Sequence, residues 1–296
     1  MPCYSPLDGW RSRTVNASGR RSIVFDMHEG YNDRPVTVPC GQCIGCRLEK
    51  SRQWAMRIMH EASLYEENAF ITLTYDDEHL PRGGSLDKTA FPKFIRSLRK
   101  RLDTKVRYYH AGEYGDSFGR PHYHAILFGF DFADKYPWSI RDGYPVWRSD
   151  TLEDIWDVGR SEIGAVTFES AAYVSRYCTK KVTGPKADEY YSVTLETGEV
   201  VHVQPEYATM SRRPGIGAEW YEQNKCEVYP ADSVVVRGKL VKPPRFYDGM
   251  FELEEPSKMA AVKRSRCKAK KPEEQRSSRL LASRTVKEAE MELYGR

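Results

Sequence analysis

The chain has 296 residues, of which 40% are hydrophobic and 30% are charged, and its formal net charge at pH 7 is +4. This composition is typical of a soluble globular protein and excludes a disordered or fibrous one. No apolar run approaches the roughly 20 residues that span a bilayer, and the N-terminal arginines adjoin no apolar core of a signal peptide, so we expect a cytoplasmic protein.

Three of the seven cysteines, Cys40, Cys43 and Cys46, lie in a turn that contains glycine. Their spacing is too tight for a disulfide framework. Structural zinc takes four tetrahedral ligands, and Cys3 is the best fourth ligand. We therefore predict a structural Zn²⁺ site at these cysteines, with reduced cysteines in a tight turn or an iron–sulfur cluster as alternatives.

Two amphipathic helices and a strand are predicted next. Residues 47–67 and 90–102 have apolar stripes at helical spacing, and residues 70–76 (FITLTYD) form a strand between them. The outer face of the second helix is almost entirely positive, with Arg96, Arg99 and Lys100 among its residues. It is either an ordinary solvated face or a phosphate-binding one.

Residues 105–127 contain the pattern that is most informative about function. Residues 105–114 and 120–127 favour two strands of a hairpin, and the second strand contains His122 and His124. Side chains at i and i+2 of a strand point to the same face, so the two imidazoles form half of a divalent-metal site. The hairpin brings Glu113 near them as third ligand, with His110 as the alternative.

Residues 169–183 favour a helix that ends before Gly184. Tyr173, Tyr177 and Lys180 fall on one face of this helix. A phenol is a weak nucleophile at neutral pH, so it must meet a phosphate made electrophilic by a metal ion. The alternative is a half-buried aromatic stripe.

The rest of the chain offers surfaces for nucleic acid. Residues 192–204 favour a hairpin, and residues 241–248 an extended connection. Between them, Arg212 and Arg213 lie on a Gly/Pro-rich loop followed by aromatic residues, which suits single-stranded DNA or a plain surface loop.

The C-terminal tail is basic. Residues 257–296 hold 12 Lys or Arg against 5 Glu, a local charge of +7, whereas the rest of the chain sums to −3. We expect this tail to be disordered or loosely helical when free and to bind DNA through phosphates.

Four consecutive segments follow from these patterns. They are a cysteine-rich element and helix (1–60), a core with the His pair and the tyrosines (61–185), a hairpin and Arg/aromatic extension (186–256), and the tail (257–296).

Three motifs in this order resemble the HUH endonucleases, and within them the rolling-circle replication initiators of microviruses, especially the gokushovirus branch. The motifs are the strand 70–76, the His-Tyr-His strand and the two-tyrosine helix with its lysine. Residues 39–47 and 210–217 are also similar to that branch. The resemblance implies an α+β, ferredoxin-like (HUH) fold, in which helices flank a central antiparallel sheet that carries the metal site.

The same resemblance implies a replication initiator that nicks the origin strand. Tyrosine attack would leave a 5′-phosphotyrosine and a free 3′-hydroxyl, with Mg²⁺ or Mn²⁺ as cofactor. Single-tyrosine relatives place their nucleophile three residues before the lysine, which corresponds to Tyr177, so we prefer Tyr177 for the first cut and Tyr173 for the second transfer. Since the sequence has no GxxxxGK[ST] loop, it predicts no nucleotide cofactor, and a host helicase and DNA polymerase would be needed in the bacterial cytoplasm.

Two alternatives remain open at this stage. The chain could be a relaxase or transposase of the same superfamily. It could also be a non-catalytic, zinc-stabilised nucleic-acid-binding protein in which the histidines and tyrosines only pack or stack.

Overall fold

A computed structural model describes residues 3–16, 19, 21–115, 119–141, 143–177, 181–182, 184–269 and 271–293, with the side chain of Tyr177 outside this part. The chain divides into two compact units. Unit 1 consists of Met1–Lys50 and Ala260–Arg296, and unit 2 of Ser51–Met259. The division differs from the four consecutive segments expected, because both ends of the chain fold into one unit.

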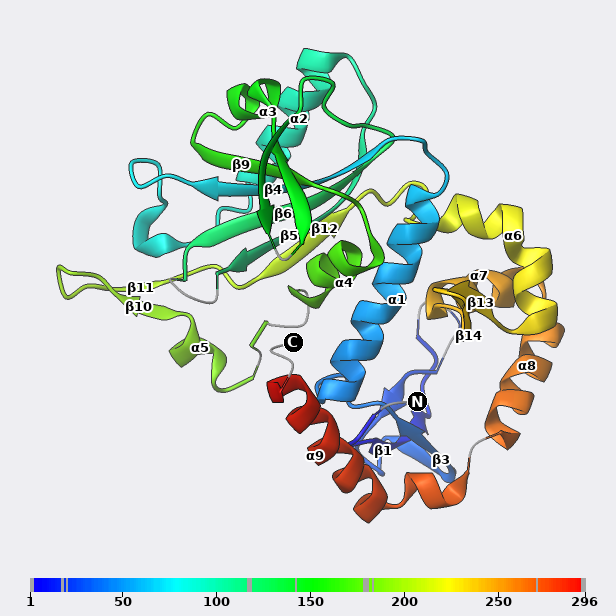
Figure 1. The fold of residues 1–296 in the computed structure, drawn as a ribbon. Helices are drawn as coiled ribbons and strands as arrows, with labels where there is room; N and C mark the ends of the chain where they lie inside the picture. The colour runs from blue at the N-terminus through cyan, green and yellow to red at the C-terminus, as the bar shows by residue number, and fades with distance from the viewer. Residues whose placement is uncertain are drawn as a thin grey trace. The chain divides into compact units, whose positions relative to one another are not determined.

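Unit 2 is built on a seven-stranded sheet with the strand order β12-β5-β6-β4-β9-β8-β7, in which every neighbouring pair is antiparallel (Figure 1). Its strands are β4 (Asn68–Tyr75), β5 (Arg107–Tyr114), β6 (Pro121–Phe128), β7 (Tyr136–Arg141), β8 (Tyr144–Arg148), β9 (Gly159–Gly164) and β12 (Tyr207–Met210). The order β5-β6-β4-β9, with one helix after β4 and another before β9, is the ferredoxin-like arrangement. The predicted α+β fold class is confirmed.

One face of this sheet is covered by α2 (Ala90–Leu102) and α3 (Asp150–Ile155). Strand β4 alternates strictly in burial, so that Ile71 and Leu73 point to this face, where they join Phe94 and Leu98 of α2 in one core. The alternation leaves the intervening residues of β4 on the opposite face.

That opposite face is covered by α1 (Ile44–Ala62) and α4 (Phe168–Tyr177). Ile58 of α1 and Val174 of α4 pack with Tyr109 of β5 and Ile126 of β6. Figure 1 shows α4 beside α1, and the two helices are joined by a contact of 3.1 Å between the hydroxyls of Ser51 and Ser175. Because it is held in this way, α4 lies against the face that carries the paired histidines.

The remaining elements of unit 2 lie outside the seven-stranded sheet. They are η1 (Arg82–Gly84), α5 (Ala187–Tyr190), β10 (Ser192–Thr194), β11 (Val200–His202), α6 (Ala218–Ala231), β13 (Val234–Val236), β14 (Lys239–Val241) and α7 (Arg245–Glu254). Strands β10 and β11 pair antiparallel, so the hairpin predicted at 192–204 is confirmed.

The extended connection predicted at 241–248 is wrong from Arg245 onwards, where α7 begins. Pro244 has an extended backbone and precedes the first helical residue, a position in which proline starts a helix rather than preventing one. Tyr247 is fully buried, which supplies the packing that the sequence pattern did not reveal.

Unit 1 contains the sheet β2-β1-β3 and the C-terminal helices. Its elements are β1 (Leu7–Ser12), β2 (Ile23–Val24), β3 (Gly30–Val38), η2 (Pro272–Gln275) and α9 (Ser277–Leu293), together with most of α8 (Pro256–Lys268). The tail was predicted to be either disordered or loosely helical, and in the structure it is helical. Leu280 of α9 is buried. In the part of the chain described, no helix is both long and apolar enough to cross a membrane.

Candidate functional site

The His pair lies in the middle of the large sheet. His122 faces Thr74 of β4 on one side and Glu113 of β5 on the other, while His124 faces Thr72 and Ala111. Directly opposed residues of antiparallel strands point to the same face, so these side chains share the face covered by α4.

Each imidazole is oriented by a threonine hydroxyl. Thr72 Oγ1 lies 3.0 Å from His124 Nδ1, and Thr74 Oγ1 lies 2.9 Å from His122 Nδ1. A hydroxyl can donate or accept, so either tautomer of the ring is compatible with this contact. When Nδ1 carries the proton, Nε2 has a free lone pair for a metal ion.

Glu113 is the carboxylate nearest to this pair of rings. Its Oε1 lies 2.7 Å from His124 Nε2, and the two residues are only 2% and 5% exposed. Adjacent ligands of one octahedral ion are about 3 Å apart when each bond is about 2.1 Å long. An ion could therefore replace the proton between these two atoms, and the nitrogen and oxygen donors suit a divalent cation.

The ring centre of His122 lies 6.3 Å from that of His124. A Cβ at Gly115 would come within 2.7 Å of His122 Nε2, so glycine is needed there for the ring to lie against the backbone. Burial lowers the pKa of His122 to about 4, assisted by electrostatic interaction with His124 and Arg120 and opposed by Glu162. The ring is thus neutral at pH 7, the form that binds metal.

Tyr173 of α4 lies beside His124. Its ring centre lies 5.2 Å from that of His124 in an edge-on arrangement, and it is 39% exposed. The phenol is therefore accessible to a large substrate beside the His124–Glu113 pair. Of the other two residues predicted on this helix face, the side chain of Tyr177 and all of Lys180 lie outside the described residues.

His110, the alternative third ligand, points to the other side of the sheet. Its ring stacks on Phe91 of α2 with centres 3.7 Å apart, and its Nδ1 contacts Thr209 Oγ1 at 3.0 Å. It therefore cannot share an ion with His122 and His124.

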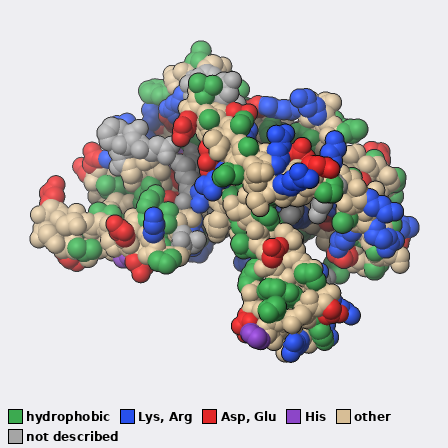
Figure 2. All heavy atoms as spheres, turned by 90° about the horizontal axis from the view of Figure 1, so that it is seen from below, with side chains coloured by type: hydrophobic (Ala, Val, Ile, Leu, Met, Phe, Trp, Pro, Cys, Tyr) green, Lys and Arg blue, Asp and Glu red, His purple; other side chains and the backbone are tan. Residues whose placement is uncertain are grey.

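The predicted basic residues lie apart from the His pair. Arg96, Arg99 and Lys100 are exposed on α2, which packs on the opposite face of the sheet. Arg212 and Arg213 are exposed in the loop after β12, which Ser211 fastens to the backbone of Tyr108. Figure 2 shows Lys and Arg side chains in several groups on one face of the molecule, interspersed with Asp and Glu.

The four cysteines predicted as zinc ligands come together in unit 1. All four sulfurs lie within 4.8 Å of one another, with 3.8 Å between Cys3 and Cys40 and 4.0 Å between Cys3 and Cys43. Tetrahedral Zn–S bonds of about 2.3 Å place sulfurs about 3.8 Å apart. The cluster could therefore hold a metal ion.

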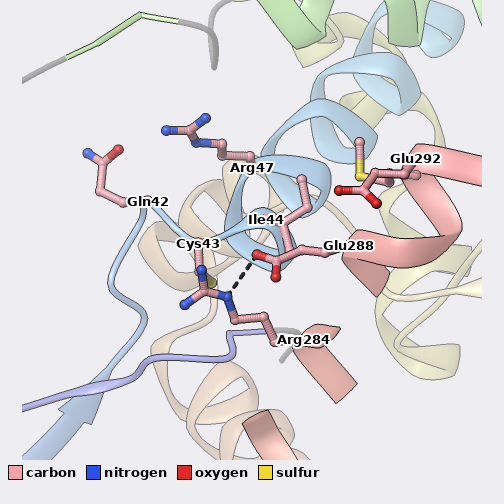
Figure 3. A pocket seen from close by; sticks show the side chains of 8 residues that line it. Gln42, Cys43, Ile44, Arg47, Arg284, Glu288 and Glu292 are labelled. Atoms are coloured by element: carbon pink, nitrogen blue, oxygen red, sulfur yellow. Dashed lines mark hydrogen bonds and ion pairs between the residues drawn. The ribbon is translucent and has the colours of Figure 1, made fainter. Parts of the chain in front are cut away.

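Hydrogen bonds favour a thiolate at Cys43, whereas burial raises the pKa of the Cys3 and Cys46 thiols. Burial raises the pKa of the Cys43 thiol, but hydrogen bonds from the backbone of Tyr4 and Cys46 and from neighbouring thiols outweigh it and bring the pKa to about 6. Arg284 of α9 lies beside Cys43 and pairs with Glu288 at 2.8 Å (Figure 3). The Glu288 bond, with a further contribution from Cys43 and Cys40, raises the pKa of Arg284.

The sequence reasoning missed Thr72, Thr74 and Glu162. The two threonines alternate at i and i+2 in the predicted strand 70–76, as the histidines do in theirs, and pairing the two strands would have brought them together. Glu162 faces Thr72 from β9, a strand that the sequence did not predict.

Comparison with known proteins places these features in one family. Residues 68–182, from the start of β4 to just beyond α4, match the family described as "Replication-associated protein ORF2/G2P". The match contains the His pair, Glu113 and the tyrosine helix. No solved structure gives a significant match to the chain.

Individual relatives extend the similarity over most of the chain. "Replication-associated protein ORF2" of Spiroplasma virus 4 is 37% identical over 276 residues, 86% of this chain and 81% of that protein. "Replication-associated protein VP4" of Bdellovibrio phage phiMH2K is 34% identical over 271 residues, 87% of this chain and 79% of that protein. "Replication-associated protein ORF4" of Chlamydia phage 1 is 32% identical over 175 residues, 53% of this chain and 42% of that protein.

Proposed function

The chain belongs to the replication-associated proteins of microviruses, the initiators of rolling-circle replication, and on that premise we propose that it nicks the viral origin strand by tyrosine attack. The observation that carries the proposal is the position of Tyr173, whose ring lies 5.2 Å from that of His124. An accessible phenol beside a His–carboxylate pair is the arrangement that phosphodiester transfer to tyrosine requires.

The transfer exchanges one phosphate ester bond for another. The Oη atom of Tyr173 or Tyr177 bonds to phosphorus while the bond from phosphorus to the 3′ oxygen breaks. The phenol loses its proton and the departing oxygen gains one, which leaves a 5′-phosphotyrosine and a free 3′-hydroxyl. The reverse reaction, with a 3′-hydroxyl as nucleophile, rejoins the displaced strand. Two tyrosines allow a second transfer before the first is undone, with Tyr177 as the nucleophile of the first cut.

His122, His124 and Glu113 are the residues that would hold Mg²⁺ or Mn²⁺. A bound divalent ion would withdraw charge from a non-bridging phosphate oxygen and stabilise the transition state. The threonine hydroxyls keep the two rings oriented, and α4 holds Tyr173 beside them. Lys180 would add positive charge near the phenol or the phosphate.

The other predicted surfaces would supply binding and stability. Arg212 and Arg213, and separately Arg96, Arg99 and Lys100, would contact DNA phosphates outside the catalytic centre. The cluster of Cys3, Cys40, Cys43 and Cys46 would hold a structural Zn²⁺, since its sulfur spacing fits tetrahedral coordination. Unwinding and extension of the 3′ end would fall to a host helicase and DNA polymerase in the bacterial cytoplasm.

The test is to incubate the full chain with labelled single-stranded origin DNA, with and without Mn²⁺, and to separate the products on a denaturing gel. We expect a protein-linked fragment that requires the metal. Replacing Tyr173 and Tyr177 together by Phe should abolish the fragment and leave DNA affinity within about twofold. The control is Tyr190→Phe, which changes an exposed phenol on α5 and should retain full activity.

The opposite outcome is equally clear. If metal-loaded protein forms no linked fragment anywhere along the origin, and if chelated and metal-loaded protein bind DNA alike, the chain is a non-catalytic nucleic-acid-binding protein. If the double Phe variant loses DNA affinity as much as activity, the phenols are structural.

A further inference from the structure

Only part of the His-bearing face is covered by helices in the described residues. Helices α1 and α4 pack on β5 and β6. On β9, by contrast, Arg160 is exposed and Glu162 is half-buried, and every residue of β7 is exposed. The sheet therefore continues past the His pair as an open surface.

Arg160 extends the row of residues that contains His122. It is directly opposite Thr74, which is in turn opposite His122, so all three point to the same face. Two strand spacings separate Arg160 from His122, about 10 Å. Across the described residues, no hydrogen bond, ion pair or ring contact is found for Arg160.

The nearest anion on the same strand face is already bound elsewhere. Glu162, two residues along β9, accepts bonds from both terminal nitrogens of Arg141 at 2.8 and 2.9 Å. This two-pronged ion pair fastens β7 to β9 and leaves the charge of Arg160 for an external anion.

Exposed aromatic side chains continue the surface beyond Arg160. Tyr144 of β8 is directly opposite Arg141 and shares its face, and it is 52% exposed. Trp138 lies at an irregularity in the pairing of β7 with β8, on the outermost strand of the sheet, and is 56% exposed, with the guanidinium of Arg148 4.4 Å from its ring centre. Large aromatic side chains at this exposure suggest a ligand with flat apolar faces.

We propose that Arg160 and Tyr144 on the open face, together with Trp138 at the edge of the sheet, bind the single DNA strand on one side of the scissile phosphate; these three residues are called the open-face track. The guanidinium would bind a backbone phosphate, and the rings would stack on bases. Single-stranded DNA is favoured over duplex because its base faces are free to stack. The track begins beside the His pair and crosses four strand spacings from β6 to β7, about 19 Å. This inference rests on the proposed function of the same site.

The test compares Arg160→Gln, Tyr144→Ala and Trp138→Ala with the wild-type full chain. Affinity for labelled single-stranded origin DNA is measured by fluorescence anisotropy, and the rate of adduct formation is measured at saturating DNA with Mn²⁺. We expect each aromatic variant to bind about tenfold more weakly. The Arg160 variant should bind more weakly, and the slope of the logarithm of its affinity against the logarithm of the salt concentration should fall by about one. Rates at saturation should stay within about twofold of wild type.

Matched controls make the outcome specific. Tyr190→Ala removes a ring that is 58% exposed on α5 and should leave affinity unchanged. On oligonucleotides truncated on the flank that the track contacts, wild type and variants should bind alike. Because Arg160 and Tyr144 are exposed, their variants test the proposal even if Trp138→Ala fails to fold.

Two results would overturn the inference. Unchanged affinity in all three variants would show that the surface contacts something other than DNA, such as a protein partner. Lowered rates at saturation with unchanged affinity would place these residues in the chemistry instead. Either result leaves the proposed function intact provided that wild-type protein forms the adduct, whereas absence of the wild-type adduct removes the proposed function itself.

Discussion

At His124, two hydrogen bonds determine which ring nitrogen is available to a metal ion. Nδ1 contacts Thr72, and Nε2 contacts Glu113. Loss of the Nε2 proton on metal binding requires Nδ1 to become the donor, and a threonine hydroxyl accepts that bond as readily as it donates one. The Thr72 hydroxyl therefore allows the change of tautomer at little cost.

Replacing Thr72 and Thr74 by Val removes both hydroxyls and keeps the branched shape. We expect the affinity for Mn²⁺ to fall tenfold to a hundredfold, the usual effect of losing partners of metal-binding residues. The measurement is Mn²⁺ binding to the DNA-free protein by electron paramagnetic resonance. Thr209→Val removes the equivalent contact to His110 on the opposite face and serves as the control. Equal losses in both variants would mean that the threonines only stabilise the fold.

The spacing of His122 and His124 was enough to predict their shared face, because strand geometry alone determines it. The spacing could not decide whether Glu113 or His110 lies next to the two histidines, because this depends on the register of β5 against β6. Nor could it identify Thr72 and Thr74, which join the site only through the pairing of β4 with β6.

At the scale of elements, the tyrosine helix is positioned by a second helix as well as by the sheet. Helix α4 packs between β5 and α1, where Ala171 and Val174 are fully buried. Helix α1 is in turn held at His60, whose ring stacks on Trp220 of α6 with centres 3.6 Å apart and whose Nδ1 lies 2.9 Å from Tyr247 Oη of α7. The rigidity of the site thus depends on a chain of packed helices.

Burial lowers the pKa of His60 to about 4, which makes this packing sensitive to acid. The unfolded chain binds a proton near pH 6.5 and the folded chain only near pH 4, so stability is full above pH 6.5 and declines as the pH falls towards 4. Between pH 7 and pH 5, the titration of His60 lowers the free energy of unfolding by about 2 kcal/mol.

His60→Phe keeps the stacked ring and removes the titration. The free energy of unfolding is measured in urea by tryptophan fluorescence at pH 7 and at pH 5. Between these two pH values it should fall by about 2 kcal/mol less in the variant than in wild type. Other buried histidines affect both proteins equally. Identical losses in the two proteins would show that His60 titrates normally in the folded state.

The sequence predicted these elements unevenly. Helix α2 was predicted at its observed bounds, whereas α1 begins at Ile44 and ends at Ala62, where Asn68 Nδ2 donates to the carbonyls of Ala62 and Tyr65. Strands β7, β8 and β9 went unpredicted. Every residue of β7 is exposed, and the sequence of β9 (GRSEIG) has Ile163 as its one large apolar residue, so the pairing in the sheet defines these strands better than their sequence patterns do.

For the whole molecule, charge follows the two units rather than the order of the sequence. Residues 1–50 and 260–296 together hold 18 Lys and Arg against 10 Asp and Glu, whereas residues 51–259 hold 28 against 32. Unit 1 is thus the cationic part, and it contains the cysteine cluster. Net positive charge in unit 1 should therefore add non-specific attraction to DNA to the phosphate contacts proposed for unit 2, whereas the chemistry depends on unit 2.

Metal removal should separate these two roles. We expect about one zinc ion per chain by elemental analysis, lost in Cys43→Ser and retained in Cys226→Ser, which changes an exposed cysteine away from the cluster. In hydrogen exchange, the Cys43 variant should lose protection in residues 3–50 and 260–293 and keep it in the sheet strands. Its affinity for non-specific DNA should fall at low salt. Retention of zinc in Cys43→Ser would contradict the assignment of this cluster.

The central claim is that a tyrosine of α4 becomes covalently linked to the origin strand. Wild-type protein is allowed to react with single-stranded origin DNA and Mn²⁺, digested with nuclease and trypsin, and examined by mass spectrometry. Cleavage after Arg160, Arg176 and Lys180 separates Tyr173, in peptide 161–176, from Tyr177, in peptide 177–180. We predict a nucleotide mass on one or both of these peptides, dependent on metal. A covalent nucleotide on any other peptide, or on none, would contradict the account.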